Sequence, residues 1–148
     1  MGTIRTVNLK DQVAKAANVM HESLFKATNG RIGGKVMGMP ALILTTTGRK
    51  SGARRTTMLT APIVDGDTVV LVASYGGDDR EPAWSLNLRA EPEVEITMDG
   101  RVRPMTARIA SAEEKAELWP RVTSTYKGYA GYQTKTNRDI PLIILTPR

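Results

Sequence analysis

The chain has 148 residues, of which 41% are hydrophobic and 24% are charged, so it has the size and composition of one globular domain. It contains no cysteine, which excludes disulfides and thiolate chemistry, and its single histidine, His21, gives no basis for a histidine-ligated metal site. It has no run of about 18 apolar residues, and its N-terminus lacks the apolar centre of a signal peptide, so we expect a cytoplasmic protein.

The net charge of +6 is distributed unevenly along the chain. Residues 1–60 contain ten Lys and Arg against two Asp and Glu, a net charge of +8, whereas the rest contains eleven against thirteen, a net charge of −2. Such a basic patch indicates an anionic partner, which could be nucleic acid, a lipid surface or a phosphorylated small molecule. Composition alone leaves these three open.

The first half of the chain reads as one helix followed by three strands. Apolar residues at helical spacing predict an amphipathic helix over roughly residues 9–27, and a glycine-rich stretch leads from it to the first strand. The strands are predicted over residues 41–47, 55–64 and 68–74. Pro62 predicts an edge position or a bulge in the second strand, and Asp65-Gly66 is a two-residue hairpin signal before the third.

The second half adds two helices and three strands. A short helix is predicted between Pro82 and Pro92, and strands over 94–98 and 102–109 form a hairpin across Asp99-Gly100. Ser111 and Glu114 form a capping box before a helix that Pro120 should kink or end, and a buried strand covers 140–146.

This order of elements predicts a mainly β fold of the α+β type. About six largely antiparallel strands joined by hairpins favour a sheet or barrel with flanking helices, and the strand–helix alternation of a dinucleotide-binding fold is absent. We expect a single domain over residues 1–148, in which residues 1–36 supply the N-terminal helix and the glycine-rich connection.

A cationic stretch, TTTGRKSGARRTT at residues 45–57, follows the first strand. Its spacing differs from that of a phosphate-binding P-loop. Two glycine N–H groups, nearby hydroxyls and the cations Arg49, Lys50, Arg54 and Arg55 could nevertheless hold phosphate or carboxylate groups. The alternative is a solvated basic turn.

Two further motifs could contact a ligand. In SYGGDDREPAWSLNLRA, residues 74–90, two glycines let the backbone approach a flat ligand, and Trp84 and Asn87 share a helix face, although Trp84 could equally be core. Tyr126, Tyr129 and Tyr132 recur every three residues, which suits either an aromatic pocket with a proton donor or packing on the barrel. No Ser-His-Asp set is present, so demanding chemistry would need a cofactor.

The motifs TTTGRKSG, VASYGG, PAWSLNLRAEPEV and ELWP, followed by the spaced tyrosines, together resemble the deazaflavin (F420)-dependent nitroreductase family over residues 40–147. This family includes the F420H2-dependent quinone reductase-like enzymes of mycobacteria and other actinobacteria. The resemblance implies an FMN-binding-type split β-barrel. It also implies hydride transfer from reduced coenzyme F420 to a small electrophilic acceptor: a quinone, an enone, a coumarin-type lactone or a nitroaromatic.

The resemblance also implies roles for individual residues. Contacts to the phosphate and oligoglutamate tail would come from Arg49, Lys50, Ser51 and Arg55. Contacts to the linker and ring would come from Thr56, Thr57, Met58, Leu59, Thr60, Val72, Ala73, Ser74 and Tyr75, and contacts on the ribitol side from Ala83, Trp84, Ser85, Leu86 and Asn87. Tyr129 would close over the cofactor, while Tyr126 and Tyr132 would position the substrate or donate a proton. No metal is implied, and Arg54 stands where the family usually has proline.

Several alternatives remain at this stage. An FMN-binding barrel of the pyridoxamine-oxidase type would keep the fold, but FMN has no glutamate tail for the cations. A non-catalytic module for polyanions, or a carrier that binds the cofactor without turnover, is also open, although nucleic acid is not expected because the aromatics lie far from the cations in sequence. Lys10, Lys15 and Lys26 leave open a peripheral association with the inner face of the membrane, and a homodimer is also open.

Overall fold

The structure, a computed structural model, describes residues 35–36 and 38–148, so the helix predicted over residues 9–27 lies outside the described residues. The strands are β1 (Lys35–Val36), β2 (Met39–Thr47), β3 (Arg54–Thr60), β4 (Ile63–Asp65), β5 (Thr68–Val72), β6 (Glu93–Met98), β7 (Arg101–Ile109) and β8 (Leu142–Pro147). The helical elements are the 3₁₀ turn η1 (Tyr75–Gly77) and the α-helices α2 (Ala83–Ala90), α3 (Ala112–Thr125) and α4 (Gly128–Thr134).

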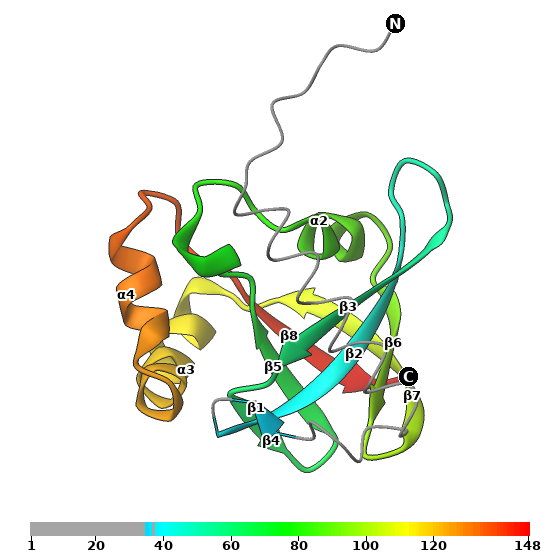
Figure 1. Cartoon of the computed structure of the whole chain (residues 1–148), viewed down its shortest axis with the longest axis horizontal. Coiled ribbons are helices and arrows are strands. Elements are labelled where there is room, and N and C mark those ends of the chain that lie inside the picture. The colour runs from blue at the N-terminus through cyan, green and yellow to red at the C-terminus, as the bar shows by residue number, and fades with distance from the viewer. Residues whose placement is uncertain (1–34, 37) are drawn as a thin grey trace, which may run out of the picture.

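The strands form one sheet that curves into a split barrel with α2, α3 and α4 around it (Figure 1). They pair in the order β1-β2-β6-β7-β8-β5-β4, with β3 attached to β2, and every pair is antiparallel. The predicted mainly β, split-barrel fold is therefore confirmed. The described residues contain eight strands rather than about six, because the short β1 and β4 are strands of their own.

Two tight turns fix the register of the sheet. Gly66-Asp67 joins β4 to β5, one residue further along than predicted, and Asp99-Gly100 joins β6 to β7 as expected. Asp99 and Gly100 both have positive φ, at 53° and 75°, the conformation that matches the twist of a two-residue hairpin. Both predicted hairpins are confirmed.

The strand predicted over residues 55–64 is divided between β3 and β4 in the structure. The Ala61 N–H still donates to the Pro40 carbonyl at 2.9 Å, but Pro62 has no N–H with which to continue the pairing. The chain therefore leaves β2 here and pairs next with β5, at the other end of the strand order. As a result, β3 and β4 border the open side of the barrel.

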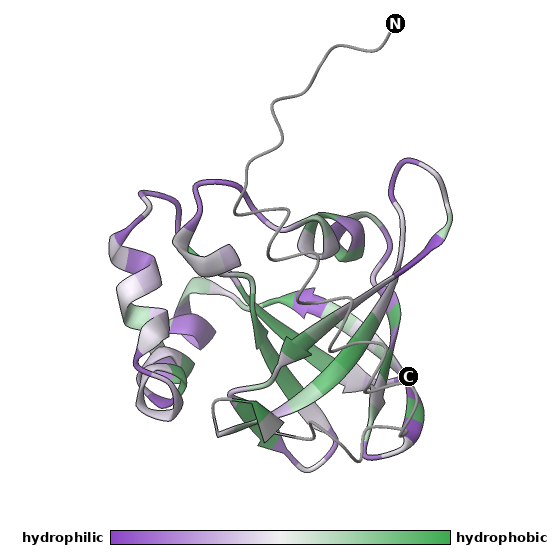
Figure 2. Ribbon diagram, in the orientation of Figure 1, coloured by the Kyte–Doolittle hydropathy of each residue, from purple (hydrophilic) through white to green (hydrophobic). Residues whose placement is uncertain are grey.

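Both faces of the central strands are buried. In β5, Val69 and Leu71 belong to the core inside the barrel, whereas the alternate residues Val70 and Val72 pack in a second cluster with Tyr129 of α4. This alternation follows from the two-residue period of a strand, whose successive side chains point to opposite faces. Figure 2 shows the same arrangement as a green, apolar sheet bordered by purple, polar turns.

The helix α3 begins at the predicted capping box. The Glu114 N–H donates to Ser111 Oγ at 3.1 Å, and the Ser111 N–H donates to Glu114 Oε1 at 2.9 Å. Hydrogen bonds from Arg108 and from the Ser111 backbone lower the pKa of Glu114 to about 2. The helix does not end at Pro120 but continues to Thr125, because a proline inside a helix removes a single N–H donor and the following turn keeps its own bonds.

The turn η1 lies directly against α4. Gly77 has φ +82°, and a Cβ atom placed on it would lie 2.8 Å from the Tyr132 carbonyl oxygen and 3.0 Å from Tyr132 Cα. Only glycine allows this backbone-to-backbone contact. The close contact at Gly77 thus places α4 beside the end of β5.

We predict that Gly77→Ala lowers the free energy of unfolding by about 3 kcal/mol, because it adds a steric clash to left-handed backbone strain. Gly66→Ala is the matched control, since Gly66 also has positive φ (+61°) but no atom lies within 4 Å of the position that an added Cβ would occupy. That variant should lose only about 1 kcal/mol. Urea unfolding measures both, and equal losses would contradict the close contact between η1 and α4.

Candidate active site

The cationic turn between β2 and β3, residues 48–53, has a defined backbone conformation. The Gly48 N–H donates to the Ala53 carbonyl at 2.7 Å, and the Gly52 N–H donates to the Gly48 carbonyl at 2.8 Å. Ser51 Oγ accepts from the Ala53 N–H at 3.1 Å, so this hydroxyl supports the turn itself. The turn projects beyond the barrel next to α2 (Figure 1).

The four cations of this region have different surroundings. Arg54 forms an ion pair with Glu95 of β6 at 2.7 Å, and Arg49 donates to the side chain of Asn87. Lys50 and Arg55 have no carboxylate within ion-pair distance in the part of the chain that the structure describes. Among the described residues Arg49, Lys50 and Arg55 therefore keep a positive charge that no carboxylate compensates, although the neutral Asn87 already binds the guanidinium of Arg49.

Asn87 joins the cationic turn to α2. Its Oδ1 accepts from both the backbone N–H and the guanidinium of Arg49, each at 3.1 Å, and its Nδ2 donates to Thr46 Oγ1 at 3.3 Å. Asn87 is 5% exposed, so its bond with Thr46 is buried, whereas its two bonds with Arg49 are partly buried. The amide predicted to face a ligand is thus also the group that holds the turn against the barrel.

The other residues predicted on α2 lie at several depths. Trp84 packs against the barrel core and Leu86 is half-buried, whereas Ala83 is exposed. Ser85 is fully buried and donates to Glu81 at 2.7 Å. Burial opposes ionisation of Glu81, but hydrogen bonds from Arg89 and Ser85 outweigh it and keep the pKa of this carboxyl below its usual value.

The strand β3 leads from the cationic turn to the tyrosines. Its seven residues extend over roughly 20 Å at the usual strand rise. Thr56 is exposed, and residues 57–60 are half-buried. At the far end, Thr60 Oγ1 lies 3.3 Å from Tyr129 Oη, so β3 connects the turn to α4 along the open side of the barrel.

The three spaced tyrosines come together as predicted, although Tyr126 lies between α3 and α4 rather than within one helix. The ring centres of Tyr126 and Tyr129 are 5.2 Å apart in an edge-to-face arrangement, and the Tyr126 and Tyr132 hydroxyl oxygens are 3.4 Å apart. Gly128 makes this possible, because a Cβ there would lie 2.4 Å from the Tyr126 ring. We call these three residues the tyrosine cluster.

The members of the tyrosine cluster differ in burial and acidity. Tyr129 is 6% exposed, and burial raises the pKa of its phenol. The hydrogen bond between Tyr132 and Tyr126, together with burial, raises the pKa of Tyr132 to about 12. Both phenols therefore keep their protons at neutral pH and can donate hydrogen bonds. Tyr126 and Tyr132 are half-buried, so they are the members with surface to offer a ligand.

The segment predicted to line the ring, residues 72–75, lies at the end of β5. Val72 and Ser74 are 8% exposed, Ala73 is fully buried and Tyr75 is half-buried. Its backbone is bound by Arg138, which donates to the carbonyls of Ala73 and Ser74 at 3.1 and 2.9 Å. Sequence reasoning missed Arg138, because a single arginine in the polar stretch TKTNRD carries no signal of such a role.

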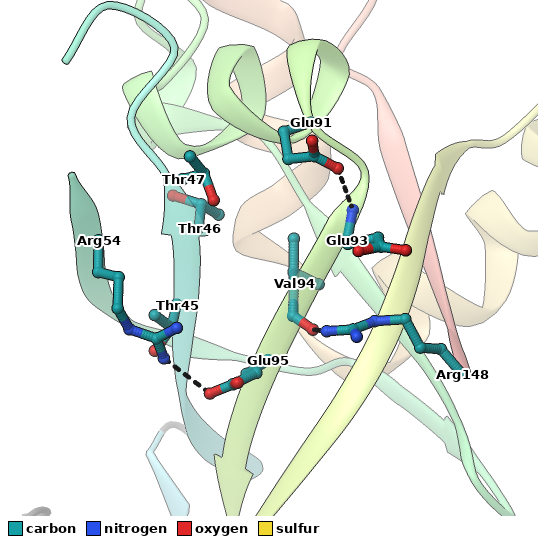
Figure 3. A pocket seen from close by; sticks show the side chains of 9 residues that line it. All are labelled: Thr45, Thr46, Thr47, Arg54, Glu91, Glu93, Val94, Glu95 and Arg148. Atoms are coloured by element: carbon teal, nitrogen blue, oxygen red, sulfur yellow. Dashed lines mark hydrogen bonds and ion pairs between the residues drawn. The ribbon is translucent and has the colours of Figure 1, made fainter. Parts of the chain in front are cut away.

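Two hollows in the described surface lie apart from the tyrosine cluster and from residues 72–75. One of about 250 Å³ lies beside β2 and β6 and is lined by three glutamates and two arginines, among others (Figure 3). It includes the Arg54–Glu95 pair and a bond from Arg148 to the Val94 carbonyl at 3.1 Å. The other, about 350 Å³, lies beside Trp119 between α3 and α4. The first hollow includes Arg54 of the cationic stretch, but neither is lined by a residue to which the family resemblance gave a cofactor or substrate contact.

Some kinds of site are not found among residues 35–36 and 38–148. No group of three His, Cys, Asp or Glu side chains there is arranged to hold a metal ion. No helix there is long and apolar enough to cross a membrane.

These features define a class of protein. It is a split barrel in which a cationic turn and a cluster of phenols lie at the two ends of one strand that borders the open side. Such a site suits an elongated ligand with an anionic end and an aromatic end.

The chain belongs to the F420H(2)-dependent quinone reductase family, whose family model matches residues 18–147. It is 41% identical over 133 residues to an F420H(2)-dependent quinone reductase of Mycobacterium tuberculosis, a match that covers 87% of this chain and 89% of the relative.

Solved structures of related chains have the same fold. One, described as an F420-H2 dependent reductase, is 40% identical with a TM-score of 0.64 and covers 72% of this chain and 93% of its own. Another, described as a domain-swapped dimer, is 36% identical with a TM-score of 0.67 and covers 86% of this chain and 96% of its own.

We predict that Asn87→Ala lowers the free energy of unfolding by about 2 kcal/mol, because it leaves the partly buried Arg49 N–H and the Thr46 hydroxyl without their partner. Asn87→Asp should lose less, since a carboxylate still accepts from Arg49 and can accept from the Thr46 hydroxyl. Amide hydrogen exchange of residues 48–53 should rise in the alanine variant. An unchanged exchange rate there would show that Asn87 does not hold the turn.

Proposed function

We propose that this chain is an F420H2-dependent reductase that transfers a hydride from reduced F420 to a small electrophilic acceptor, with quinones as the first class to test. Family membership supports the cofactor and the reaction type. The structural observation that carries the proposal is the group of cations without a carboxylate partner among the described residues, Arg49, Lys50 and Arg55, at one end of β3 with the tyrosine cluster at the other. Enones, coumarin-type lactones and activated nitroaromatics are further acceptor classes with an electrophilic centre.

The described residues fit the cofactor in charge. Lys50 and Arg55 would hold the phosphate and oligoglutamate tail, since neither forms an ion pair with a carboxylate of the described residues and the tail carries several negative charges. Arg49 would contribute less, because Asn87 already engages its guanidinium. The side chains of β3 would line the linker, residues 72–75 would border the ring, and residues 83–87, with Trp84 among them, would lie on the ribitol side.

The reduced deazaflavin, when bound, supplies the hydride. The protein's part is to orient the acceptor, to exclude water and to provide a proton. Tyr126 and Tyr132 are suited to providing the proton, since both are partly exposed and their hydroxyl oxygens are 3.4 Å apart. Tyr129 has its hydroxyl against Thr60 and Met39, so closing over the cofactor would require this side chain to move.

Other functions are weaker fits. FMN has one phosphate and would leave part of the cationic turn unused, and a polyanion-binding module would not need the tyrosine cluster at the far end of β3. A carrier that binds F420 without turnover differs only in lacking reductase activity. The homodimer gains support from the related chain described as a domain-swapped dimer. Peripheral membrane association stays a prediction, because the helix that carries it lies outside the described residues.

The binding prediction concerns the cofactor tail. The protein should bind oxidised F420 in a fluorescence titration, more weakly at high salt, and should bind FMN far less. Lys50→Ala and Arg55→Ala should each weaken F420 binding about tenfold, which corresponds to about 1.4 kcal/mol.

The control for this titration is Arg101→Ala, which removes one charge from the exposed β6–β7 turn and should leave the affinity unchanged. Preference for FMN would contradict the cofactor assignment. Equal effects of all three substitutions would contradict the turn as the tail site.

The catalytic prediction concerns the phenols. Tyr126→Phe or Tyr132→Phe should lower kcat for quinone reduction about tenfold or more at saturating F420H2, because each removes a hydroxyl while keeping the ring. The affinity for F420 should change little. Since the pKa of Tyr132 is raised to about 12, its deprotonation should not lower the wild-type rate between about pH 6 and pH 9. Wild-type turnover and acceptor range in both variants would refute this role.

A further inference from the structure

The connection that follows β5 has an unusual backbone. Tyr75, Gly76 and Gly77 have φ angles of 45°, 62° and 82°, so three consecutive residues are left-handed. For Tyr75, which has a Cβ, this conformation is unfavourable by itself. Such backbone persists only where surrounding contacts hold it, and it recurs where a ligand site has to be arranged in advance.

Arg138 supplies three of those contacts. Its Nη2 donates to the Ala73 and Ser74 carbonyls at 3.1 and 2.9 Å, and its Nε donates to the Asp78 carbonyl at 2.9 Å. One planar guanidinium therefore bonds to both ends of the left-handed turn. These bonds are charge-assisted, which makes them stronger than bonds between neutral groups.

Arg138 is in turn fixed by its neighbours. Its backbone carbonyl accepts from Gln133 of α4 at 2.8 Å, and its N–H donates to the Thr136 hydroxyl, which bonds to Asp79 at 2.7 Å. Its Nη1 is buried and has no hydrogen-bond partner among the described residues.

The geometry of the peptide bond shows what Arg138 controls. In a planar trans peptide the C=O and the following N–H point in opposite directions. With the Ala73 and Ser74 carbonyls turned toward Arg138, the N–H groups of Ser74 and Tyr75 point away from it. The backbone of Ser74 is in the right-handed helical region (φ −78°, ψ −34°), and that of Tyr75 is in the left-handed region. A right-handed residue followed by a left-handed one directs successive N–H groups toward one concave side, which accepts carbonyl or anionic oxygens.

We infer that Arg138 is a positioning residue, which holds the N–H group of Ser74 in place for a carbonyl oxygen of the deazaflavin ring. This inference rests on the proposed function, since it assumes that the ring lies beside residues 72–75. Arg138 would act through the backbone and would not touch the cofactor. Because the tail is held elsewhere, loss of Arg138 should disturb the orientation of the ring more than the overall affinity for F420.

Arg148 offers a matched control. It also donates to backbone carbonyls, of Met105 at 3.2 Å and Val94 at 3.1 Å, but on β7 and β6 rather than next to the ring segment. Arg138→Met and Arg148→Met thus remove the same kind of bond at two places. Arg138→Lys keeps the charge but replaces the fork with a single ammonium, which cannot reach all three carbonyls in the same geometry.

The first measurement needs no cofactor. Amide hydrogen exchange of residues 73–80 should be about tenfold faster or more in Arg138→Met, intermediate in Arg138→Lys and unchanged in Arg148→Met. Unchanged exchange in the Arg138 variants would overturn the inference. If Arg138→Met does not fold, the comparison of Arg138→Lys with the wild type decides in the same way.

The second measurement separates binding from catalysis. In Arg138→Met the affinity for F420 should weaken by no more than about threefold, whereas kcat should fall about tenfold or more, because misplacement of a reacting ring affects the rate more than the binding. Faster exchange with wild-type kcat would overturn the positioning role. Failure of the wild-type protein itself to bind F420 or reduce a quinone would instead refute the proposed function, and the two failures are therefore distinguishable.

Discussion

The missing N–H of Pro62 is the constraint on which the shape of this barrel depends. Pairing of β3 with β2 continues through the Ala61 N–H and cannot go further, so the chain turns and its next strand, β4, pairs with β5. A short connection thus joins β3, which is attached to β2, to β4, which is attached to β5, and no pairing between β3 and β4 closes the barrel. The open side, with β3 along it, is where the assigned residues gather.

An open side of this kind has to be held in shape by contacts other than strand pairing. At one end Asn87 binds the cationic turn to α2, and at the other Tyr129 reaches from α4 to Thr60. Arg138 and Gly77 attach α4 to the connection after β5 by different means, one through hydrogen bonds and the other through the absence of a side chain. The site is therefore built from long-range contacts that join segments far apart in the sequence.

Local signals predicted the parts of this structure that depend on local chemistry. The Asp99-Gly100 turn and the capping box at Ser111 follow from conformational preferences within a few residues, and the motifs were specific enough to indicate the family. Contacts between distant segments could not be predicted in the same way. Nothing in the sequence distinguishes Arg138 from other arginines, and no local signal shows that the helix continues past Pro120 to Thr125.

Arg54 illustrates the same limit for charge. In the sequence it is a fourth cation of the basic stretch, but in the structure it pairs with Glu95 of β6 at 2.7 Å. Its side chain is 68% exposed, so this pair contributes only about 0–1 kcal/mol to stability. The ion pair has a larger consequence for the electrostatic field around the turn, because Arg54 directs its charge toward the outer surface of the sheet. Of the four cations in the motif, only Arg49, Lys50 and Arg55 therefore lack a carboxylate partner among the described residues, so a count of cations overstates the uncompensated charge of the turn.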